Sequence, residues 1–222
     1  MLIHIANVLD AATVQAVAAA CQSLIFQDGK STAGWHAKAV KNNQQAVPSE
    51  ELTRLQEIIA DALGRHPVLR AFAMPARIAP PLISRTGPGE GYGTHVDDAI
   101  MGTAARFRSD LSVTLFLSDP ASYDGGDLVV ETAGGDDSAK FAAGDAAVYA
   151  STSLHRVEPV ERGERLVAAT WIQSLVRDAA TREMLFDLDR ARRMLFEEGG
   201  KSPAFDLVSK TYSNLLRRHA EL

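Results

Sequence analysis

A series of short β-prone segments between residues 76 and 177 constrains the fold more than any other feature of this sequence. Each segment is rich in apolar and β-branched residues, and glycine, proline or aspartate separates it from the next. Strands this short and this regularly interrupted are typical of a sandwich or barrel. The candidate strands are residues 77–84, 93–97, 111–117, 127–131, 139–142, 146–149, 155–159 and 165–175, with predicted turns at 124–127, 133–137 and 143–145. Eight such strands predict a double-stranded β-helix, or jelly roll.

Helical patterns flank this β region on both sides. Residues 1–75 begin with a short strand, followed by one predicted helix from Asp10 to about residue 25 and another that begins at Ser49. Residues 178–222 predict two helices separated by a pair of glycines. We therefore expect a mainly β, α+β protein with an N-terminal helical segment, a jelly-roll domain and a C-terminal helical hairpin. The apolar stripe of the hairpin should pack on the barrel or against a second copy in a homo-oligomer.

Charge and cysteine content narrow the classes of partner and compartment. The 222-residue chain has a formal net charge of −5 and no Lys/Arg-rich block, so we do not expect nucleic acid or an anionic membrane as a partner. No apolar run approaches the length needed to cross a bilayer. The single cysteine, Cys21, fits a reducing compartment, and no lysine or arginine precedes Lys30, as a signal peptide would require. We expect a cytoplasmic protein that acts on a small molecule or a peptide.

Three residues predict a metal centre. His95 and Asp97 lie two positions apart in a predicted strand, so their side chains point to the same face. His155, at the start of another predicted strand, offers a third ligand. Two histidines and one carboxylate form the facial triad of non-haem Fe(II) oxygenases. Two other classes share this triad: a cupin-like metalloenzyme without 2-oxoglutarate, and a non-enzymatic iron-binding or sensing protein.

Arg165, ten positions after His155, separates these alternatives. A guanidinium near such an iron suits a dicarboxylate co-substrate, because it binds a carboxylate through two parallel hydrogen bonds. Even offsets along the strand place Trp171 on the same face as Arg165, so we expect it to form the wall of the co-substrate pocket. Thr114 and Phe116 share the predicted inner face of strand 111–117 and should line the same pocket.

A polar run between the N-terminal helices has no evident packing role. Lys41 and Asn42 belong to this run, and Arg106 and Arg108 follow the predicted strand that carries the first two ligands. We expect these four residues to line the mouth of the pocket and to orient the substrate; a solvated loop is the alternative for the run.

Five runs of the sequence closely resemble one bacterial family. They are residues 40–45, 92–97, 108–120, 123–128 and 153–155. Over its whole length, including the helical tail, the chain is similar to the PKHD-type hydroxylases, which are Fe(II)- and 2-oxoglutarate-dependent dioxygenases. The resemblance implies that His95, Asp97 and His155 hold Fe(II), and that Arg165 binds the distal carboxylate of 2-oxoglutarate.

The resemblance also implies the reaction. A C–H bond of an amino-acyl, peptide or iron-uptake-related small-molecule substrate would be hydroxylated, with succinate and CO₂ as co-products. Ascorbate (vitamin C) would serve as a reductant, and the family is associated with iron homeostasis. One position departs from the pattern: Thr86 stands where relatives commonly carry a tyrosine. Related prolyl hydroxylases use a tyrosine in this region to contact the co-substrate, so we do not expect that contact here.

Overall fold

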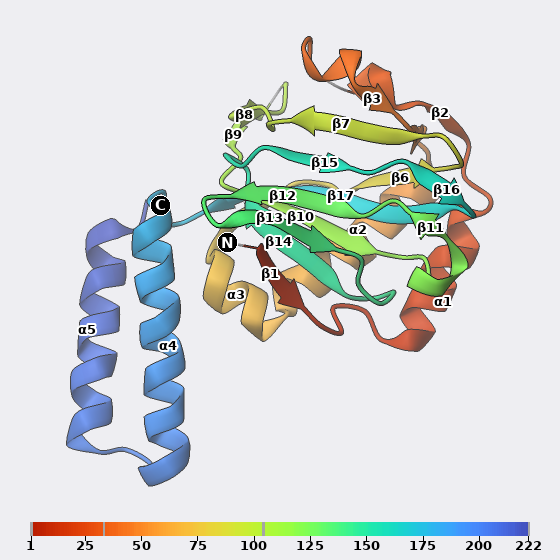
Figure 1. Cartoon of the computed structure of the whole chain (residues 1–222). Coiled ribbons are helices and arrows are strands. Elements are labelled where there is room, and N and C mark those ends of the chain that lie inside the picture. The colour runs from red at the N-terminus through yellow and green to blue at the C-terminus, as the bar shows by residue number, and fades with distance from the viewer. Residues whose placement is uncertain (1, 33, 104, 222) are drawn as a thin grey trace.

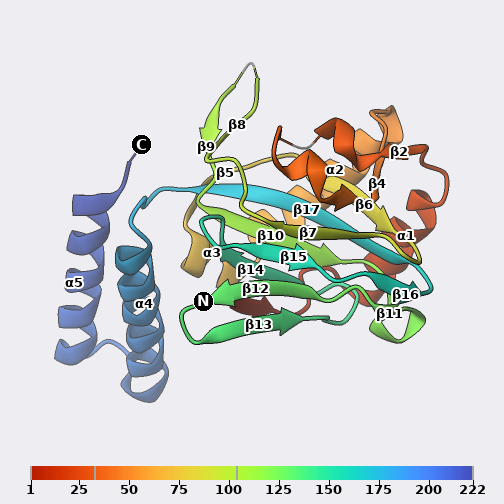
Figure 2. The same cartoon turned by 45° about the horizontal axis from the view of Figure 1, so that its top comes forward.

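The computed structural model describes residues 2–32, 34–103 and 105–221, and it contains two facing antiparallel sheets (Figures 1 and 2). The larger sheet has the order β1-β14-β10-β17-β6-β4-β2, with β5 also paired to β17. Its strands are β1 (Leu2–Ile5), β2 (Phe26–Asp28), β4 (Gln44–Ala46), β5 (Pro75–Ile78), β6 (Leu82–Thr86), β10 (Leu111–Phe116), β14 (Ala146–Ala150) and β17 (Arg165–Ser174).

The smaller sheet has the order β13-β12-β15-β7-β3. Its strands are β3 (Lys41–Asn42), β7 (Gly91–His95), β12 (Leu128–Thr132), β13 (Gly135–Ala139) and β15 (His155–Val157). Two ribbons complete the β structure: β8 (Ile100–Met101) with β9 (Phe107–Arg108), and β11 (Asp124–Gly125) with β16 (Val160–Arg162). The helices are α1 (Ala11–Cys21), α2 (Glu50–Arg65), α3 (Pro67–Ala73), α4 (Ala179–Gly199) and α5 (Pro203–His219), with 3₁₀ turns at Gly29–Thr32, Ala37–Ala39 and Pro120–Ser122.

A small apolar core joins the two sheets. Phe116, Tyr149 and Val167 from the larger sheet pack against Leu128 and Val130 from the smaller one. All five are buried, as alternating inward positions of two stacked sheets require. The predicted jelly roll with flanking helices is confirmed.

The main core lies on the other side of the larger sheet, where α1, α2 and α3 cover it. Side chains cap the first turns of α1 and α2, close to where the sequence predicted that both helices begin. The Asp10 carboxylate accepts a hydrogen bond from the Thr13 amide (2.7 Å), and the Ser49 hydroxyl accepts one from the Leu52 amide (3.1 Å). The apolar stripe of α2, spaced at the helical period, is buried at Leu52, Leu55, Ile59 and Leu63. This layer holds one face of the sheet rigid and leaves the opposite face for a site.

Several predicted boundaries differ from the structure. The segment 77–84 is two strands, β5 and β6, because the consecutive prolines Pro80 and Pro81 have no amide hydrogen for a ladder. The predicted turn at 133–137 is mostly β13, and the predicted strand 139–142 retains only its first residue. Helix α1 ends at Cys21 instead of about residue 25, and α3 was not expected.

The polar run that contains Lys41 is part of both sheets. Its β3 pairs with β7 in the smaller sheet, and its β4 pairs with β6 in the larger one. The chain therefore passes from one sheet to the other within a few residues. This crossing places the run beside the space between the sheets, so the N-terminal segment contributes directly to the barrel.

The C-terminal hairpin contacts the barrel region mainly through its base. Leu185 packs with Met74 and Val176 in a small buried cluster, while the rest of α4 and α5 extends away from the sheets in Figure 1. Phe196 and Leu207 remain more than half exposed. The expected packing on the barrel thus applies to the base of the hairpin. None of the helices in the described ranges is long and apolar enough to span a membrane.

Candidate metal centre and its cavity

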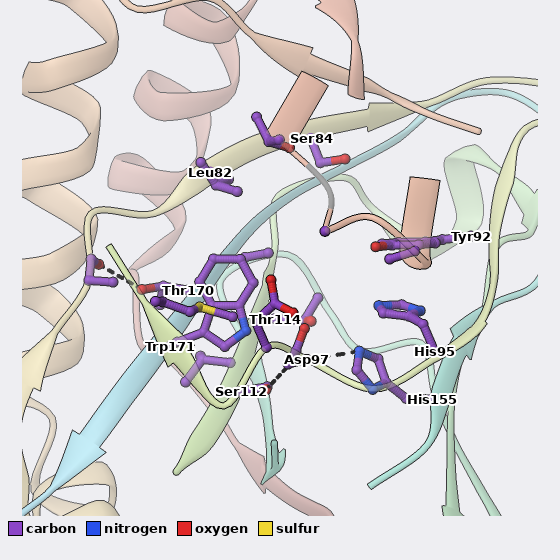
Figure 3. A pocket seen from close by; sticks show the side chains of 18 of the residues that line it. Leu82, Ser84, Tyr92, His95, Asp97, Ser112, Thr114, His155, Thr170 and Trp171 are labelled. Atoms are coloured by element: carbon purple, nitrogen blue, oxygen red, sulfur yellow. Dashed lines mark hydrogen bonds and ion pairs between the residues drawn. The ribbon is translucent and has the colours of Figure 1, made fainter. Parts of the chain in front are cut away.

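A cavity of about 690 Å³ lies between the two sheets and contains the predicted triad (Figure 3). A cavity of this size accommodates a co-substrate together with a second small molecule. Its walls come from β6, β7, β10 and β17, and from the polar run at β3 and β4.

The triad comes from two neighbouring strands. His95 ends β7, Asp97 follows it, and His155 begins β15, where it lies opposite His95 in the ladder. One ligand atom from each of the three lies within 4.8 Å of the other two. The His155 and Asp97 side chains are 6% and 9% exposed, which shields a bound ion from bulk water.

Both imidazoles are oriented for metal binding. Nδ1 of His95 donates a hydrogen bond to the Gly93 carbonyl (2.9 Å), and Nδ1 of His155 donates one to the Ser153 carbonyl (3.1 Å). A carbonyl can only accept, so the proton resides on Nδ1 and the Nε2 lone pair is free. Burial and the neighbouring His155 lower the pKa of His95, which favours the neutral imidazole that a metal requires. The Tyr92 ring stacks on the imidazole of His95, with 3.6 Å between the two ring centroids.

The Asp97 carboxylate has a partner that the sequence did not reveal. The Ser112 hydroxyl, on β10 of the opposite sheet, donates a 2.5 Å hydrogen bond to Asp97 Oδ2. The Ser151 hydroxyl lies 2.8 Å from that of Ser112 and extends the network. The same oxygen, Oδ2, lies 3.8 Å from Nε2 of His155, so these contacts hold the carboxylate beside the histidine.

Arg165 lies in the same cavity as a buried cation. Arg165 is the first residue of β17 and is 3% exposed. Its Nε and Nη2 atoms have no hydrogen-bond partner among the described residues. Burial lowers the pKa of its guanidinium, and the nearby Tyr123 and Tyr149, together with Asp127 beyond salt-bridge distance, oppose this shift. A buried guanidinium without a carboxylate is unfavourable, so the geometry fits an external carboxylate at this position.

The other predicted co-substrate residues occupy different positions. Trp171 and Thr114 line the cavity, whereas Phe116 lies beneath Arg165, with its ring centroid 5.6 Å from the guanidinium carbon. Thr86 pairs with Arg165 across the β6–β17 ladder but is not on the cavity wall. Tyr149 lines the cavity and was missed, although its position in a short apolar strand is a readable signal.

The four predicted substrate residues separate into two groups. Lys41 lines the cavity and is 5% exposed. Asn42 is exposed and donates to the Gly89 carbonyl (3.3 Å), and Arg106 is exposed outside the cavity wall. Arg108 donates hydrogen bonds to Asp110 and Glu221 and to a backbone carbonyl, which ties the C-terminus to the barrel. Of the four residues, only Lys41 is brought to the metal centre.

Comparisons with known proteins decide the family. Residues 81–173 match the family described as the 2OG-Fe(II) oxygenase superfamily, and residues 178–221 match the PKHD-type hydroxylase C-terminal domain. The chain is 50% identical over 223 residues to a PKHD-type hydroxylase of Synechococcus elongatus, and the alignment covers 100% of both. The chain belongs to the PKHD-type hydroxylases. A second PKHD-type hydroxylase, from Thermosynechococcus vestitus, is 48% identical over 224 residues, again with 100% of both covered.

Solved structures share the fold of this PKHD-type hydroxylase. A prolyl-4-hydroxylase from Pseudomonas putida has a TM-score of 0.52 at 22% identity, covering 78% of this chain and 92% of that one. The carbocyclase SnoK of nogalamycin biosynthesis has a TM-score of 0.55 at 15% identity, covering 79% and 80%. The protein is thus a 2-oxoglutarate-dependent hydroxylase with an Fe(II) site, and neither the cupin-like nor the non-enzymatic alternative is favoured.

Proposed function

We propose that this hydroxylase binds Fe(II) through Nε2 of His95, a carboxylate oxygen of Asp97 and Nε2 of His155, and binds the distal carboxylate of 2-oxoglutarate through Arg165. The observation that carries the proposal is the buried guanidinium of Arg165, which shares a cavity with the triad and whose Nε and Nη2 have no hydrogen-bond partner among the described residues. When bound, the iron would supply, together with 2-oxoglutarate and dioxygen, the oxidative chemistry that converts a C–H bond to C–OH; one oxygen atom of dioxygen enters the product and the other enters succinate, with release of CO₂.

The protein's own contribution is positional. Hydrogen bonds from the two imidazoles and from Ser112 hold the ligand atoms in place before the metal arrives. Thr114 and Trp171 form the wall beside the co-substrate, and the buried cavity limits water at the reacting centre.

The class of substrate and the setting of the enzyme remain proposals. The structural relatives include prolyl hydroxylases, one of them in complex with a peptide fragment of hypoxia inducible factor. An amino-acyl or peptide substrate, or a small molecule of iron uptake, is consistent with the cavity. We further propose ascorbate as the reductant, a role in iron homeostasis and a cytoplasmic location. The exposed apolar residues of the hairpin also support a homo-oligomer, which light scattering of the purified protein would test.

Anaerobic spectroscopy tests the assignment of the metal and co-substrate residues. Addition of 2-oxoglutarate to the Fe(II) protein should produce a visible metal-to-ligand charge-transfer band. Arg165→Ala should weaken the apparent affinity in this titration by on the order of 10- to 100-fold, the effect of a lost charge-assisted pair. Arg162→Ala removes an exposed arginine of β16 that pairs with Asp124, and it serves as the matched control. An unchanged titration for Arg165→Ala would contradict the proposal.

A further inference from the structure

Lys41 is a buried lysine in the wall of the cavity. It lies on β3, opposite Tyr92 in the β3–β7 ladder, and is 5% exposed. Its ammonium nitrogen lies 5.2 Å from the centroid of the Tyr92 ring, which in turn stacks on the imidazole of His95. One aromatic ring therefore separates this cation from a metal ligand.

Within the described part of the chain, the ammonium group donates one hydrogen bond, to the Thr32 hydroxyl (3.0 Å), whereas an ammonium carries three donors. No salt bridge to Lys41 occurs within the described ranges. Burial lowers its pKa to about 8, although Asp97 and Asp28 at longer range oppose this shift. A lysine that costs stability in this way is typical of a residue retained for function.

The surrounding residues hold the lysine in position. A Cβ at Gly29 would lie 2.0 Å from Oδ1 of Asn43 and 3.1 Å from Cε of Lys41, so the loop can approach β3 this closely only with glycine there. Asn43 is fixed in turn, because its amide donates to the Ser84 hydroxyl (2.9 Å). Asn43 and Ser84 also line the cavity and carry no charge. In the part of the cavity wall formed by Lys41, Asn43 and Ser84, Lys41 is thus the charged residue.

When Fe(II) and 2-oxoglutarate are bound, the positive charge of Lys41 has no buried negative charge to balance it among the described residues of the cavity. Under the proposed function, the charges of Fe(II), Asp97 and Arg165 sum to plus two, which the dianion 2-oxoglutarate neutralises. Asp98 lines the cavity only at its open side, with a side chain 55% exposed. Among the described residues, no buried carboxylate on the cavity wall then remains to balance the positive charge of Lys41. A substrate with one negative group supplies it.

We propose that Lys41 binds a carboxylate of the substrate and that the substrate of this hydroxylase is a small molecule with a free carboxylate. This inference rests on the proposed function and names its substrate class. A carboxylate at Lys41 lies beside the Tyr92 ring, and the rest of a small acid then extends toward the triad. An internal residue of a polypeptide has no main-chain carboxylate, so Lys41 selects free acids over internal peptide positions.

Nuclear magnetic resonance of ¹³C-methylated lysines tests binding without knowledge of the natural substrate. The protein is loaded with redox-inert Zn(II) and saturating 2-oxoglutarate, and the Lys41 signal is assigned by its absence in Lys41→Arg. Acetate, L-proline and L-lysine are then titrated in parallel with acetamide and the two amino-acid carboxamides. The acids should shift the Lys41 signal and the amides should not, while the signal of the exposed Lys38 stays in place in both series. Absence of a shift with every acid, or equal shifts with acids and amides, overturns the proposal.

Substitutions give an independent test with the Fe(II) enzyme. For an acid that stimulates succinate release, Lys41→Met should raise KM by on the order of 10- to 100-fold, and the control Lys38→Met should not. The charge-transfer titration gives a second check. If Lys41→Met lowers the apparent affinity for 2-oxoglutarate as strongly as Arg165→Ala does, Lys41 belongs to the co-substrate site and the proposal fails. An N-acetylated, C-amidated prolyl peptide has no free carboxylate. If it stimulates succinate release equally in the parent and in Lys41→Met, the proposal is also overturned. A parent protein that forms no charge-transfer band would refute the proposed function itself.

Discussion

The Ser112 hydroxyl donates a 2.5 Å hydrogen bond to Asp97 Oδ2 and thereby links the two sheets of the jelly roll at the metal centre. Asp97 follows the last strand residue of β7 in the smaller sheet, and Ser112 belongs to β10 in the larger one. The position of the carboxylate ligand therefore depends on how the two sheets are stacked.

Replacement of Ser112 tests this dependence. Ser112→Ala leaves the Asp97 carboxylate without its buried donor, so we expect Fe(II) affinity to fall by roughly 10- to 100-fold, as for other residues that orient metal ligands. Competition with a colorimetric chelator measures the affinity. Ser138→Ala, at an exposed serine of β13, is the control. Parent-like affinity in Ser112→Ala would show that the bond does not position the ligand.

Arg165 should affect stability and co-substrate binding in opposite directions. Its buried guanidinium lacks partners at Nε and Nη2 among the described residues, so Arg165→Met removes an unfavourable charge from the empty protein. We expect an equal or higher free energy of unfolding for apo Arg165→Met. Metal and 2-oxoglutarate together should stabilise the parent more than the variant, because a ligand that binds only the folded state stabilises it and the variant binds 2-oxoglutarate more weakly. Thermal unfolding with and without both ligands measures this. A strongly destabilised apo variant would contradict the argument.

Lys41 predicts a specific dependence of stability on pH. Its pKa is about 8 in the folded protein against an ordinary 10.5, so between these values the unfolded chain binds more protons. The free energy of unfolding contributed by Lys41 therefore increases as pH rises from about 8 to 10.5. The parent should gain up to roughly 3 kcal/mol relative to Lys41→Met across this window. Urea unfolding of both proteins at pH 7.5 and 10 measures the difference, and a constant difference would rule out the shift.

The C-terminal hairpin depends on a buried carboxylate. Asp189 of α4 accepts hydrogen bonds from Arg192 and Arg193, and the Arg192 guanidinium lies 3.9 Å from the centroid of the Tyr212 ring on α5. Burial would raise the pKa of Asp189, but the hydrogen bonds from Arg193 and Arg192 outweigh it and lower the pKa.

Asp189→Asn should therefore loosen the hairpin without affecting the metal centre. Because the two arginines remain partly exposed, the loss of their hydrogen bonds to the buried carboxylate costs about 1 to 2 kcal/mol, which we expect to appear as faster hydrogen exchange in α5. The affinity for 2-oxoglutarate should not change. Asp187→Asn, at an exposed carboxylate of the same helix, is the control. Unchanged exchange in α5 would show that Arg192 is held on Tyr212 without Asp189.

The sequence by itself determined the parts that follow from local periodicity. The short spacing of His95 and Asp97 predicted that they share one site, which is observed although β7 ends at His95 and Asp97 lies beyond it. Helix-opening residues and apolar spacing located α2 and the C-terminal pair. The short interrupted strands determined the class of fold because such strands must close into a sandwich or barrel to bury their faces. The residue pattern also suggested His155 as the third ligand and Arg165 as a carboxylate binder, and family resemblance supported both roles.

Only the tertiary structure decided which distant residues meet. The Ser112–Asp97 bond, the unpaired state of Arg165 and the position of Lys41 beside Tyr92 all arise between strands whose pairing partners are far apart in the chain. Local propensity carries no information about such pairing, because a strand exposes the same hydrogen-bonding groups to any neighbour. Arg108 illustrates this: its place in the sequence suggested the pocket mouth, and the fold instead directs it to Asp110 and Glu221.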